Sequence, residues 1–293
     1  MAPSIAPSLA PSIAPSVAPS IAPSIAPSLA PSIAPSVAPS NDLLARIKEK
    51  GVIRVSIEPQ YPPYSFQKPD ETFDGFNVDV ANEIAKRLGV TAAFEIPSFD
   101  LVVAGSWNDQ WDMSVGAVTI TDPRKEVLDF TQPYAYSPAQ MAVTNASGIT
   151  TLDGLAGQTV CVGAATTYQQ WIEGTLSLVD APPPAVPPAG ATTFPLPTDT
   201  DCILPVQSGT ANFQGWLTSA DTLEPALASG IPMTAVGDPV FYESLGIAFD
   251  KTVADNEALV AAVDAIVGEM HQDGTLLTLS EKWFNGKDRV TAH

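Results

Sequence analysis

Apolar residues in the first half of the chain follow two alternating spacings. Residues Val52–Ile57 (VIRVSI) alternate like a strand, whereas Asn77–Leu88 has apolar residues three and four positions apart, which predicts a helix ending at Gly89. Asn41 is expected to cap an earlier helix that ends at Gly51. Further short strands are predicted at Phe94–Ile96, Met113–Val115 and Ala142–Thr144.

The second half of the chain repeats this alternation. The predicted elements are a strand at Thr159–Val162, a helix at Tyr168–Leu176, a proline-rich loop at Asp180–Pro197, a strand at Ile247–Phe249 and helices at Asn256–Gln272 and Gly274–Phe284. Alternation of strands and helices is typical of an α/β fold. Two such units of similar size, one interrupted by the other, predict two lobes around a cleft.

Residues 1–40 form a low-complexity repeat of Ala-Pro-Ser followed by Ile, Leu or Val. A proline at every fourth position removes backbone donors and disfavours helices and central strands. We expect a disordered, extended and partly polyproline-like spacer that holds the rest of the chain away from a surface. A cloning or gene-calling artefact is the alternative.

The charge of the chain argues against some function classes. Its 293 residues include 32 acidic and 13 basic side chains, for a formal charge of −19. Nucleic-acid binding and docking on an anionic membrane both need a basic surface. The sequence has no apolar run long enough to span a membrane, and its N-terminus lacks the charged region and apolar core of a signal peptide. A secretion signal or lipid-anchor cysteine could precede Met1.

Cysteine and histidine are scarce. The chain contains two cysteines, Cys161 and Cys202, and two histidines, His271 and His293. Neither pair has the spacing of a metal site. We therefore expect no metal, no cofactor and no Ser-His-Asp triad. Neighbouring elements could bring Cys161 and Cys202 together as a disulfide, which fits an oxidising compartment. Two buried free thiols are the alternative.

Four motifs occur in order along the chain. They are Tyr61–Phe66 (YPPYSF), Gly75–Ala81 (GFNVDVA), Thr119–Arg124 (TITDPR) followed by Leu128–Tyr134 (LDFTQPY), and Asp273–Leu276 (DGTL) followed by Lys282–Phe284 (KWF). Together they resemble the family-3 extracellular solute-binding proteins, the amino-acid receptors of ABC importers. The resemblance extends from about Leu43 to Asp288, with Asn77 where the family usually has Asp.

This resemblance implies a two-lobed Venus-flytrap fold of the type II periplasmic-binding-protein kind, each lobe a mixed sheet flanked by helices. Lobe 1 would comprise residues 41–136 and 245–293, and lobe 2 residues 137–244. The lobes would close over one small, polar amino acid or related carboxylate and deliver it to the membrane permease of an ABC importer. The protein would act as a monomer outside the cytoplasm, tethered to the membrane through its N-terminal spacer.

The resemblance places the ligand's carboxylate at Arg124. Its guanidinium offers a bidentate fork shaped for a carboxylate. Thr119 adds a hydroxyl, and Gly116 and Ala117 add backbone groups. The alternative is a capped helical turn in which Arg124 pairs with a nearby acid, Glu126 or Asp129.

Two threonines at a predicted helix start, Thr166 and Thr167, would complete this cage from the second lobe. Simple helix capping is equally compatible with their position. Glu58, Tyr61 and Phe99 match family positions around the ligand's side chain, where two rings and an acid suit a polar or cationic amino acid. The alternative is that the rings are core residues and Glu58 a solvated strand end.

The position that binds the ligand's α-ammonium departs from the family. Ser219 stands where an Asp is usual. Asp221, two residues further on, or Glu58 could take over that role. A carboxylate ligand without a normally bound amine also remains an option.

Two other functions fit the same resemblance. Some relatives resemble dehydratases of cyclohexadienyl compounds, in which acids and bases in the pocket transfer protons. The chain offers Glu58 and Asp221 for such chemistry but no well-placed His or Lys. A ligand-sensing receptor component is the other alternative, and it would need a separate signalling partner.

Overall fold

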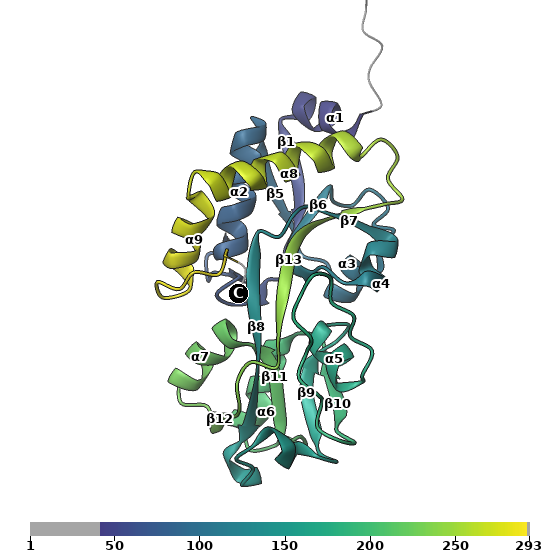
Figure 1. The fold of residues 1–293 in the computed structure, drawn as a ribbon. Coiled ribbons are helices and arrows are strands. Elements are labelled where there is room, and N and C mark those ends of the chain that lie inside the picture. Colours follow the sequence, from purple (N-terminus) through teal and green to yellow (C-terminus); the bar gives the residue numbers. More distant parts are fainter. Residues whose placement is uncertain (1–41, 292–293) are drawn as a thin grey trace, which may run out of the picture. The chain divides into compact units, whose positions relative to one another are not determined.

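A ten-stranded mixed sheet organises residues 42–291, which are the part of the chain that the computed structural model describes (Figure 1). Its strands lie in the order β10-β9-β11-β8-β13-β6-β1-β5, with β12 beside β8 and β7 beside β13. Their bounds are β1 Val52–Ser56, β5 Thr91–Glu95, β6 Met113–Thr119, β7 Leu128–Phe130, β8 Ala135–Thr144, β9 Thr159–Gly163, β10 Thr192–Leu196, β11 Gly215–Ser219, β12 Met233–Ala235 and β13 Phe241–Asp250. A smaller sheet contains β2 Gln60–Tyr61, β3 Ser65–Gln67 and β4 Phe73–Asp74.

Helices alternate with these strands along the chain. They are α1 Leu43–Lys50, α2 Phe76–Leu88, α3 Phe99–Ala104, α4 Asp122–Val127, α5 Thr167–Ile172, α6 Ile203–Gln207, α7 Ala220–Ala228, α8 Glu257–Gln272 and α9 Thr275–Trp283, with short 3-10 turns η1 Asn145–Ser147, η2 Leu152–Leu155 and η3 Asp199–Cys202. Among the described residues, none of these helices has the length and apolar character needed to cross a membrane.

The strands β8 and β13 run antiparallel through the middle of the sheet (Figure 1). Phe241 pairs with Ala139 and Leu245 with Ala135, so Ser244 lies opposite Tyr136. The lobe boundaries predicted from the sequence follow Tyr136 and Ser244. These boundaries stay a prediction. In this register, the two points where the chain would pass from one lobe to the other are direct neighbours in one strand pair.

Apolar side chains form separate cores toward the two ends of this strand pair. The largest core combines the first and last parts of the chain, with Ile53 and Ile84 packed in the same cluster as Val263 and Leu276. Helices α2, α8 and α9 contribute to it because their apolar residues recur at helical spacing on one face. The other large cores belong to the middle of the chain and include Trp171 in one cluster and Trp216 in another.

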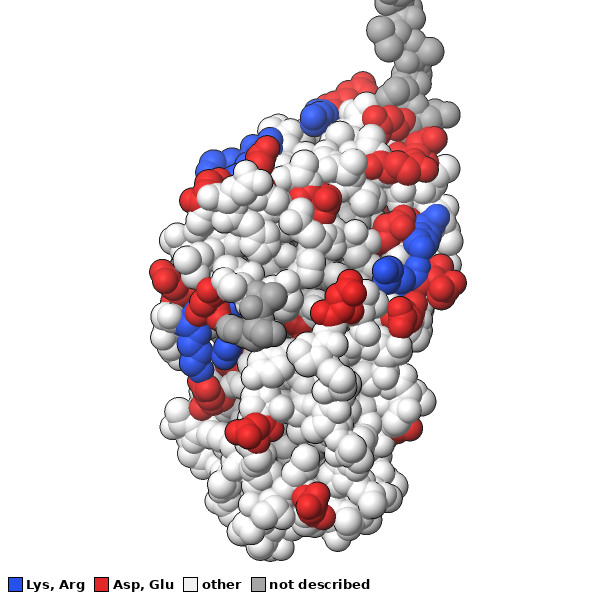
Figure 2. All heavy atoms as spheres, in the orientation of Figure 1, with Lys and Arg blue, Asp and Glu red and all other residues white. Residues whose placement is uncertain are grey.

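Charged side chains are distributed unevenly over the visible face. Figure 2 shows most of the blue and red residues over the upper part of the molecule, around the elements from both chain ends, and few over the lower part. The sequence explains this, because residues 137–244 contain no Lys, Arg or His. The middle of the chain therefore contributes only negative formal charge.

Some element predictions need correction. The structure gives Asp42 as the cap of α1, its Oδ1 accepting from the Leu44 N–H at 2.9 Å, and Asn41 lies outside the described residues. Strand β10 lies within the predicted proline-rich loop, and it tolerates Pro195 because it is an edge strand that pairs only with β9. Helix α5 is shorter than predicted, because Gly174 takes a left-handed conformation soon after Ile172.

Candidate functional site

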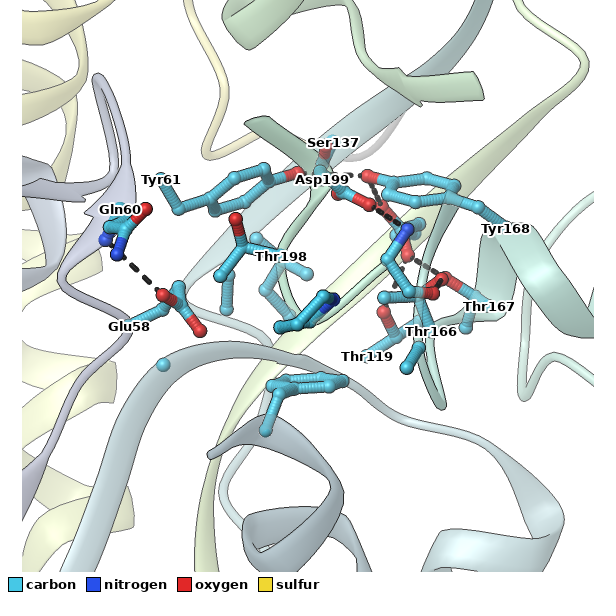
Figure 3. Close-up of a pocket in the computed structure, with 18 of the residues that line it drawn as sticks. Glu58, Gln60, Tyr61, Thr119, Ser137, Thr166, Thr167, Tyr168, Thr198 and Asp199 are labelled. Atoms are coloured by element: carbon cyan, nitrogen blue, oxygen red, sulfur yellow. Dashed lines mark hydrogen bonds between the residues drawn. The ribbon is translucent and has the colours of Figure 1, made fainter. Parts of the chain in front are cut away.

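A cavity opens between elements from the two halves of the sheet (Figure 3). Its volume is about 50 Å³, several times the roughly 10–15 Å³ that one water needs on the same measure. Nine of the eleven residues predicted to bind ligand line its wall: Glu58, Tyr61, Phe99, Gly116, Ala117, Thr119, Arg124, Thr166 and Thr167. The structure thus brings together side chains that are more than a hundred positions apart in the sequence.

Arg124 lies in the first turn of α4, which Thr121 caps by accepting a hydrogen bond from the Arg124 N–H at 3.3 Å. Its Nη1 donates to the Thr119 carbonyl and its Nη2 to the Ala165 carbonyl, both at 3.0 Å. The guanidinium carbon lies 5.3 Å from the centre of the Phe99 ring, a cation–π distance. The predicted alternative, an ion pair with Glu126 or Asp129, does not form in this structure.

The guanidinium of Arg124 is buried, with 4% of the residue exposed, and its Nε has no hydrogen-bond partner. Burial lowers the pKa of this arginine to about 10, although the nearby negative charge of Glu243 acts in the opposite direction. A buried donor without a partner is costly. One N–H of this wall residue therefore remains without a hydrogen bond.

Glu243, which the sequence analysis missed, extends from β13 into the same cavity. Its Oε1 accepts from the hydroxyl of Thr119 at 2.6 Å and from that of Thr167, and its Oε2 accepts from the Tyr168 hydroxyl at 2.8 Å. These partners come from β6 and from α5, so one carboxylate joins both sides of the cavity. The only sequence signal was an acid within a strand that is otherwise largely apolar (FYESLGIAFD).

Asp199 is a second acid on the cavity wall that the sequence analysis missed. Its Oδ1 accepts from the Gly163 N–H at 2.5 Å and its Oδ2 from the Thr218 hydroxyl at 3.3 Å. Burial is the main cause that raises the pKa of Asp199 to about 8, and the negative charge of Glu243 contributes. The carboxyl of Asp199 thus tends to keep its proton unless a positive charge approaches.

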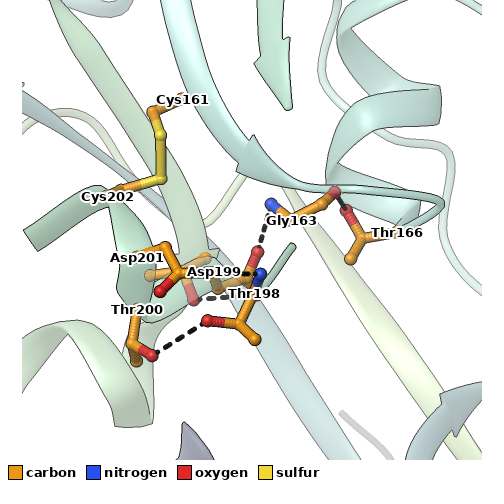
Figure 4. The surroundings of a disulfide bond; sticks show 9 residues. Cys161, Gly163, Thr166, Thr198, Asp199, Thr200, Asp201 and Cys202 are labelled. Carbon is orange, nitrogen blue, oxygen red and sulfur yellow. Dashed lines mark hydrogen bonds between the residues drawn. A yellow bond between two sulfur atoms is a disulfide. The ribbon is translucent and has the colours of Figure 1, made fainter. Parts of the chain in front are cut away.

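A disulfide fixes the turn that carries Asp199 (Figure 4). Cys161 on β9 is bonded to Cys202 at the end of η3, which confirms the predicted pairing. Both cysteines are fully buried. Because Gly163 on β9 donates to Asp199 in the same region, the disulfide and this hydrogen bond hold strand and turn together.

Aromatic and acidic side chains form the other part of the wall. The hydroxyls of Tyr61 and Tyr168 lie 2.9 Å apart, within hydrogen-bond distance. Glu58 accepts from the Gln60 N–H at 3.2 Å, and burial raises its pKa to about 6. In Figure 3, Glu58 and Gln60 lie at the opposite end of the pocket from Thr119, Thr166 and Thr167.

Ser219 and Asp221 do not line this cavity. The Ser219 hydroxyl is within hydrogen-bond distance of the hydroxyls of Tyr64, at 3.2 Å, and Ser137, at 3.1 Å. Asp221 forms an ion pair with Arg289 at 2.8 Å. Ser219 therefore lies behind the wall residue Ser137, and Asp221 has its charged partner in Arg289.

Metal binding has no support in the described residues, where no group of three or more His, Cys, Asp or Glu side chains is placed to hold an ion. The site offers instead one arginine, several hydroxyls, two tyrosines and three carboxyl groups. Such a set can bind a small molecule that carries charges of both signs.

Comparison with known proteins identifies the family. A family model described as "Bacterial extracellular solute-binding proteins, family 3" matches residues 53–286. The chain belongs to this family. L-cystine-binding protein TcyJ of Escherichia coli K12 is 34% identical over 244 residues, which cover 83% of this chain and 86% of that protein.

Solved structures of solute-binding proteins confirm the predicted α/β fold of the type II periplasmic-binding-protein kind. An ancestral arginine-binding protein bound to arginine matches with a TM-score of 0.68 and 26% identity, covering 80% of this chain and 98% of that one. The ancestral amino acid-binding protein AncCDT-1, a precursor of cyclohexadienyl dehydratase, matches with a TM-score of 0.68 and 26% identity, covering 82% and 99%.

Proposed function

We propose that this family-3 protein binds a polar amino acid in the cavity, with the ligand's carboxylate held by Arg124. The observation that carries the proposal is that Arg124 lines the cavity while its buried Nε has no hydrogen-bond partner. A ligand carboxylate would satisfy this donor. We extend the same role to backbone groups of the neighbouring wall residues Gly116, Ala117 and Thr166. Thr119 and Thr167 would contact the carboxylate without donating their hydroxyls to it, because those hydroxyls donate to Glu243.

The energetics are adequate for such a site. Hydrogen bonds to charged groups contribute about 1.5–3 kcal/mol each. Two or three of them would supply most of the roughly 8 kcal/mol that a micromolar dissociation constant requires. The Phe99 ring, which already lies over the guanidinium of Arg124, would shield these bonds from water.

The far end of the cavity favours a polar or cationic ligand side chain. Glu58 and Gln60 lie there, away from the threonines near Arg124 (Figure 3). Tyr61 and Phe99 provide ring surface along the wall. An amino acid whose carboxylate contacts Arg124 would therefore extend its side chain toward an acid and an amide.

The test is ligand-dependent thermal stabilisation of protein stripped of bound ligand. Arginine, cystine and each of the common amino acids are added separately. A ligand present at about 100 times its dissociation constant stabilises the folded state by about 2.7 kcal/mol. Arg124→Ala should abolish the rise in melting temperature. Arg46→Ala, which removes an exposed arginine from α1, is the matched control and should keep it.

Two results would count against this function. One is a screen in which no amino acid or related carboxylate raises the melting temperature of the wild-type protein. The other is a folded Arg124→Ala variant that binds as tightly as the wild type.

A cyclohexadienyl dehydratase-like activity is the second candidate. It is favoured by the similarity to AncCDT-1 and by the pair of carboxyl groups at Asp199 and Glu243, one of which has a raised pKa near 8. Such a pair could supply an acid and a base for an elimination. Incubation with prephenate or arogenate, followed by detection of the aromatic product, would distinguish an enzyme from a binding protein.

The family also suggests the setting of this protein. We propose that it works outside the cytoplasm as a monomer and delivers its ligand to the permease of an ABC importer. We further propose that residues 1–40 tether it to the membrane surface. Co-purification with a permease, and release from membranes after cleavage in the repeat, would test the two parts separately.

A further inference from the structure

Asp199 and Glu243 enter the cavity as two buried carboxyl groups whose protein partners are all hydrogen-bond donors. Asp199 is 7% exposed and Glu243 is 4% exposed. Asp199 accepts from an amide and a hydroxyl, and Glu243 accepts from three hydroxyls. Neither forms an ion pair in the described part of the chain. Buried carboxylates are usually paired with a cation, so the site is incomplete as it stands.

The remaining acceptor positions match an ammonium group in number. A carboxylate has about four lone-pair positions. Hydrogen bonds within the protein use two of these positions at Asp199 and three at Glu243. About two positions therefore remain on Asp199 and about one on Glu243. An ammonium group has three N–H donors. Both carboxyl groups line the same cavity, and the negative charge of Glu243 raises the pKa of Asp199.

The same cavity contains an unpartnered group of the opposite sign. The Nε of Arg124 is buried without a hydrogen-bond partner, and an anion would supply the missing acceptor. Asp199 and Glu243, on the wall of the same cavity, would be neutralised by a cation. An α-amino acid carries a carboxylate and an ammonium group on one carbon, so it satisfies both demands at once.

Other positions are poorly suited to the ammonium group. Position 219 carries serine and does not line the cavity, and Asp221 is paired with Arg289. Glu58 lies at the opposite end of the pocket from the threonines that contact Glu243 (Figure 3). Residues 137–244, which supply both Asp199 and Glu243, contain no Lys, Arg or His. Arg124 lines the same cavity and its charge interacts with that of Glu243, but its guanidinium donates to two backbone carbonyls and forms no ion pair with either acid.

We propose that Asp199 and Glu243 together bind the α-ammonium group of the ligand and thereby select for ligands with a free α-amine. This inference rests on the proposed function, because it requires the ligand's carboxylate at Arg124. It assigns the amine to a turn after β10 and to the central strand β13, rather than to the end of β11, where Ser219 stands.

The experiment compares ligands that differ only in the α-amine. Arginine is paired with guanidinopentanoate and cystine with dithiodipropionate, the same molecules without their α-amino groups. Calorimetric titration of the stripped, full-length protein should show at least about tenfold weaker binding of the amine-free partner, since hydrogen bonds to a charged group are lost. Equal affinities for the two members of a pair would overturn the inference while leaving the proposed function intact.

Variants then locate the amine. Asp199→Asn and Glu243→Gln should each weaken binding of the amino acid by about tenfold or more and change binding of the amine-free partner far less. Glu126→Gln, which neutralises an exposed acid on α4, is the charge control and should keep the wild-type ratio. Loss of affinity for both ligands to the same extent would assign these acids a structural role instead.

The outcomes separate this inference from the function on which it rests. If one variant does not fold, as judged by its melting curve, the other variant and the wild-type ligand pairs decide the question. If the wild-type protein binds no common amino acid, the proposed function fails, and this inference fails with it.

Discussion

The carboxylate of Asp221 on α7 accepts three hydrogen bonds, at 2.8, 2.9 and 3.1 Å, from the guanidinium of Arg289 near the C-terminus. The two side chains are only 2% and 13% exposed. The pair joins the middle of the chain to its last described segment, and a surface pair between Lys287 and Glu224 lies beside it. The C-terminal segment is therefore a structural connection between the two parts of the fold.

Breaking this ion pair should destabilise the protein. Arg289→Gln would leave the Asp221 carboxylate buried without its cation, at a cost of about 3 kcal/mol in the free energy of unfolding. Urea unfolding curves would measure the loss. The double variant Asp221→Asn, Arg289→Gln should lose clearly less than the sum of the single variants. A loss below about 0.5 kcal/mol for Arg289→Gln would contradict the importance given to the pair.

Reduction of the disulfide should also lower stability. Cys161 and Cys202 are separated by 41 positions, and a bridge over such a loop contributes about 4 kcal/mol on the chain-entropy model. Unfolding in the presence and absence of a reductant would measure the difference. The variant Cys161→Ser, Cys202→Ser is the control, because the reductant should have no effect on it. Identical curves for the reduced and oxidised wild type would exclude this contribution.

Gly75 should resist substitution for reasons of conformation and space. Its φ is +128°, and a Cβ at this position would lie 2.5 Å from the Tyr64 carbonyl oxygen. Gly75→Ala should therefore cost about 3 kcal/mol or more. Gly89→Ala is the matched control at the other end of α2, where φ is +80° and nothing lies within 4 Å of an added Cβ, so only about 1–2 kcal/mol is expected. Equal losses would show that crowding at Gly75 is unimportant.

Asp199 should make the ligand-free protein less stable as pH rises. Its pKa is raised to about 8 from an ordinary value of 3.8, so between these pH values the folded state holds a proton that the unfolded chain has released. This contribution to stability is complete below about pH 4 and is lost as pH rises through about 8. The charges of Glu243 and Glu58 both raise the pKa of Asp199. They therefore favour the same loss of stability with rising pH.

Melting temperatures from pH 5 to pH 9 would measure this effect. The wild type should lose more stability over that range than Asp199→Asn, which has no proton to release at this position. Glu126→Gln should follow the wild-type curve. Parallel curves for the wild type and Asp199→Asn would contradict the raised pKa.

The sequence was informative where the signal is local or is shared with a family. The spacing of Val80, Ile84 and Leu88 follows one face of α2, and Gly89 ends that helix as predicted. The motif Thr119–Arg124 located a buried arginine on the cavity wall. The pairing of Cys161 with Cys202 was also correct, because few alternatives exist for two cysteines.

Two of the three acids of the cavity, Asp199 and Glu243, could not be recognised in this way. Glu243 is one acid within an apolar strand, and Asp199 is one of two in Asp-Thr-Asp. Nothing in those segments says which side chain is buried. Conversely, Asp221 was a reasonable candidate by position, but its side chain meets Arg289, which lies 68 positions away.

The sequence by itself determined the family, the main helices and the motif that contains Arg124, because each depends on residues close together or on a motif. It left the two cysteines as either a disulfide or two free thiols. Only the tertiary structure showed that Asp199 and Glu243 face the cavity and that the two cysteines are bonded. For Glu243 that outcome depends on the pairing of β13 with distant strands, since neighbouring residues in a strand point to opposite sides and the register selects the side that meets the cavity. For Asp199 it depends on the bonds that join η3 to β9.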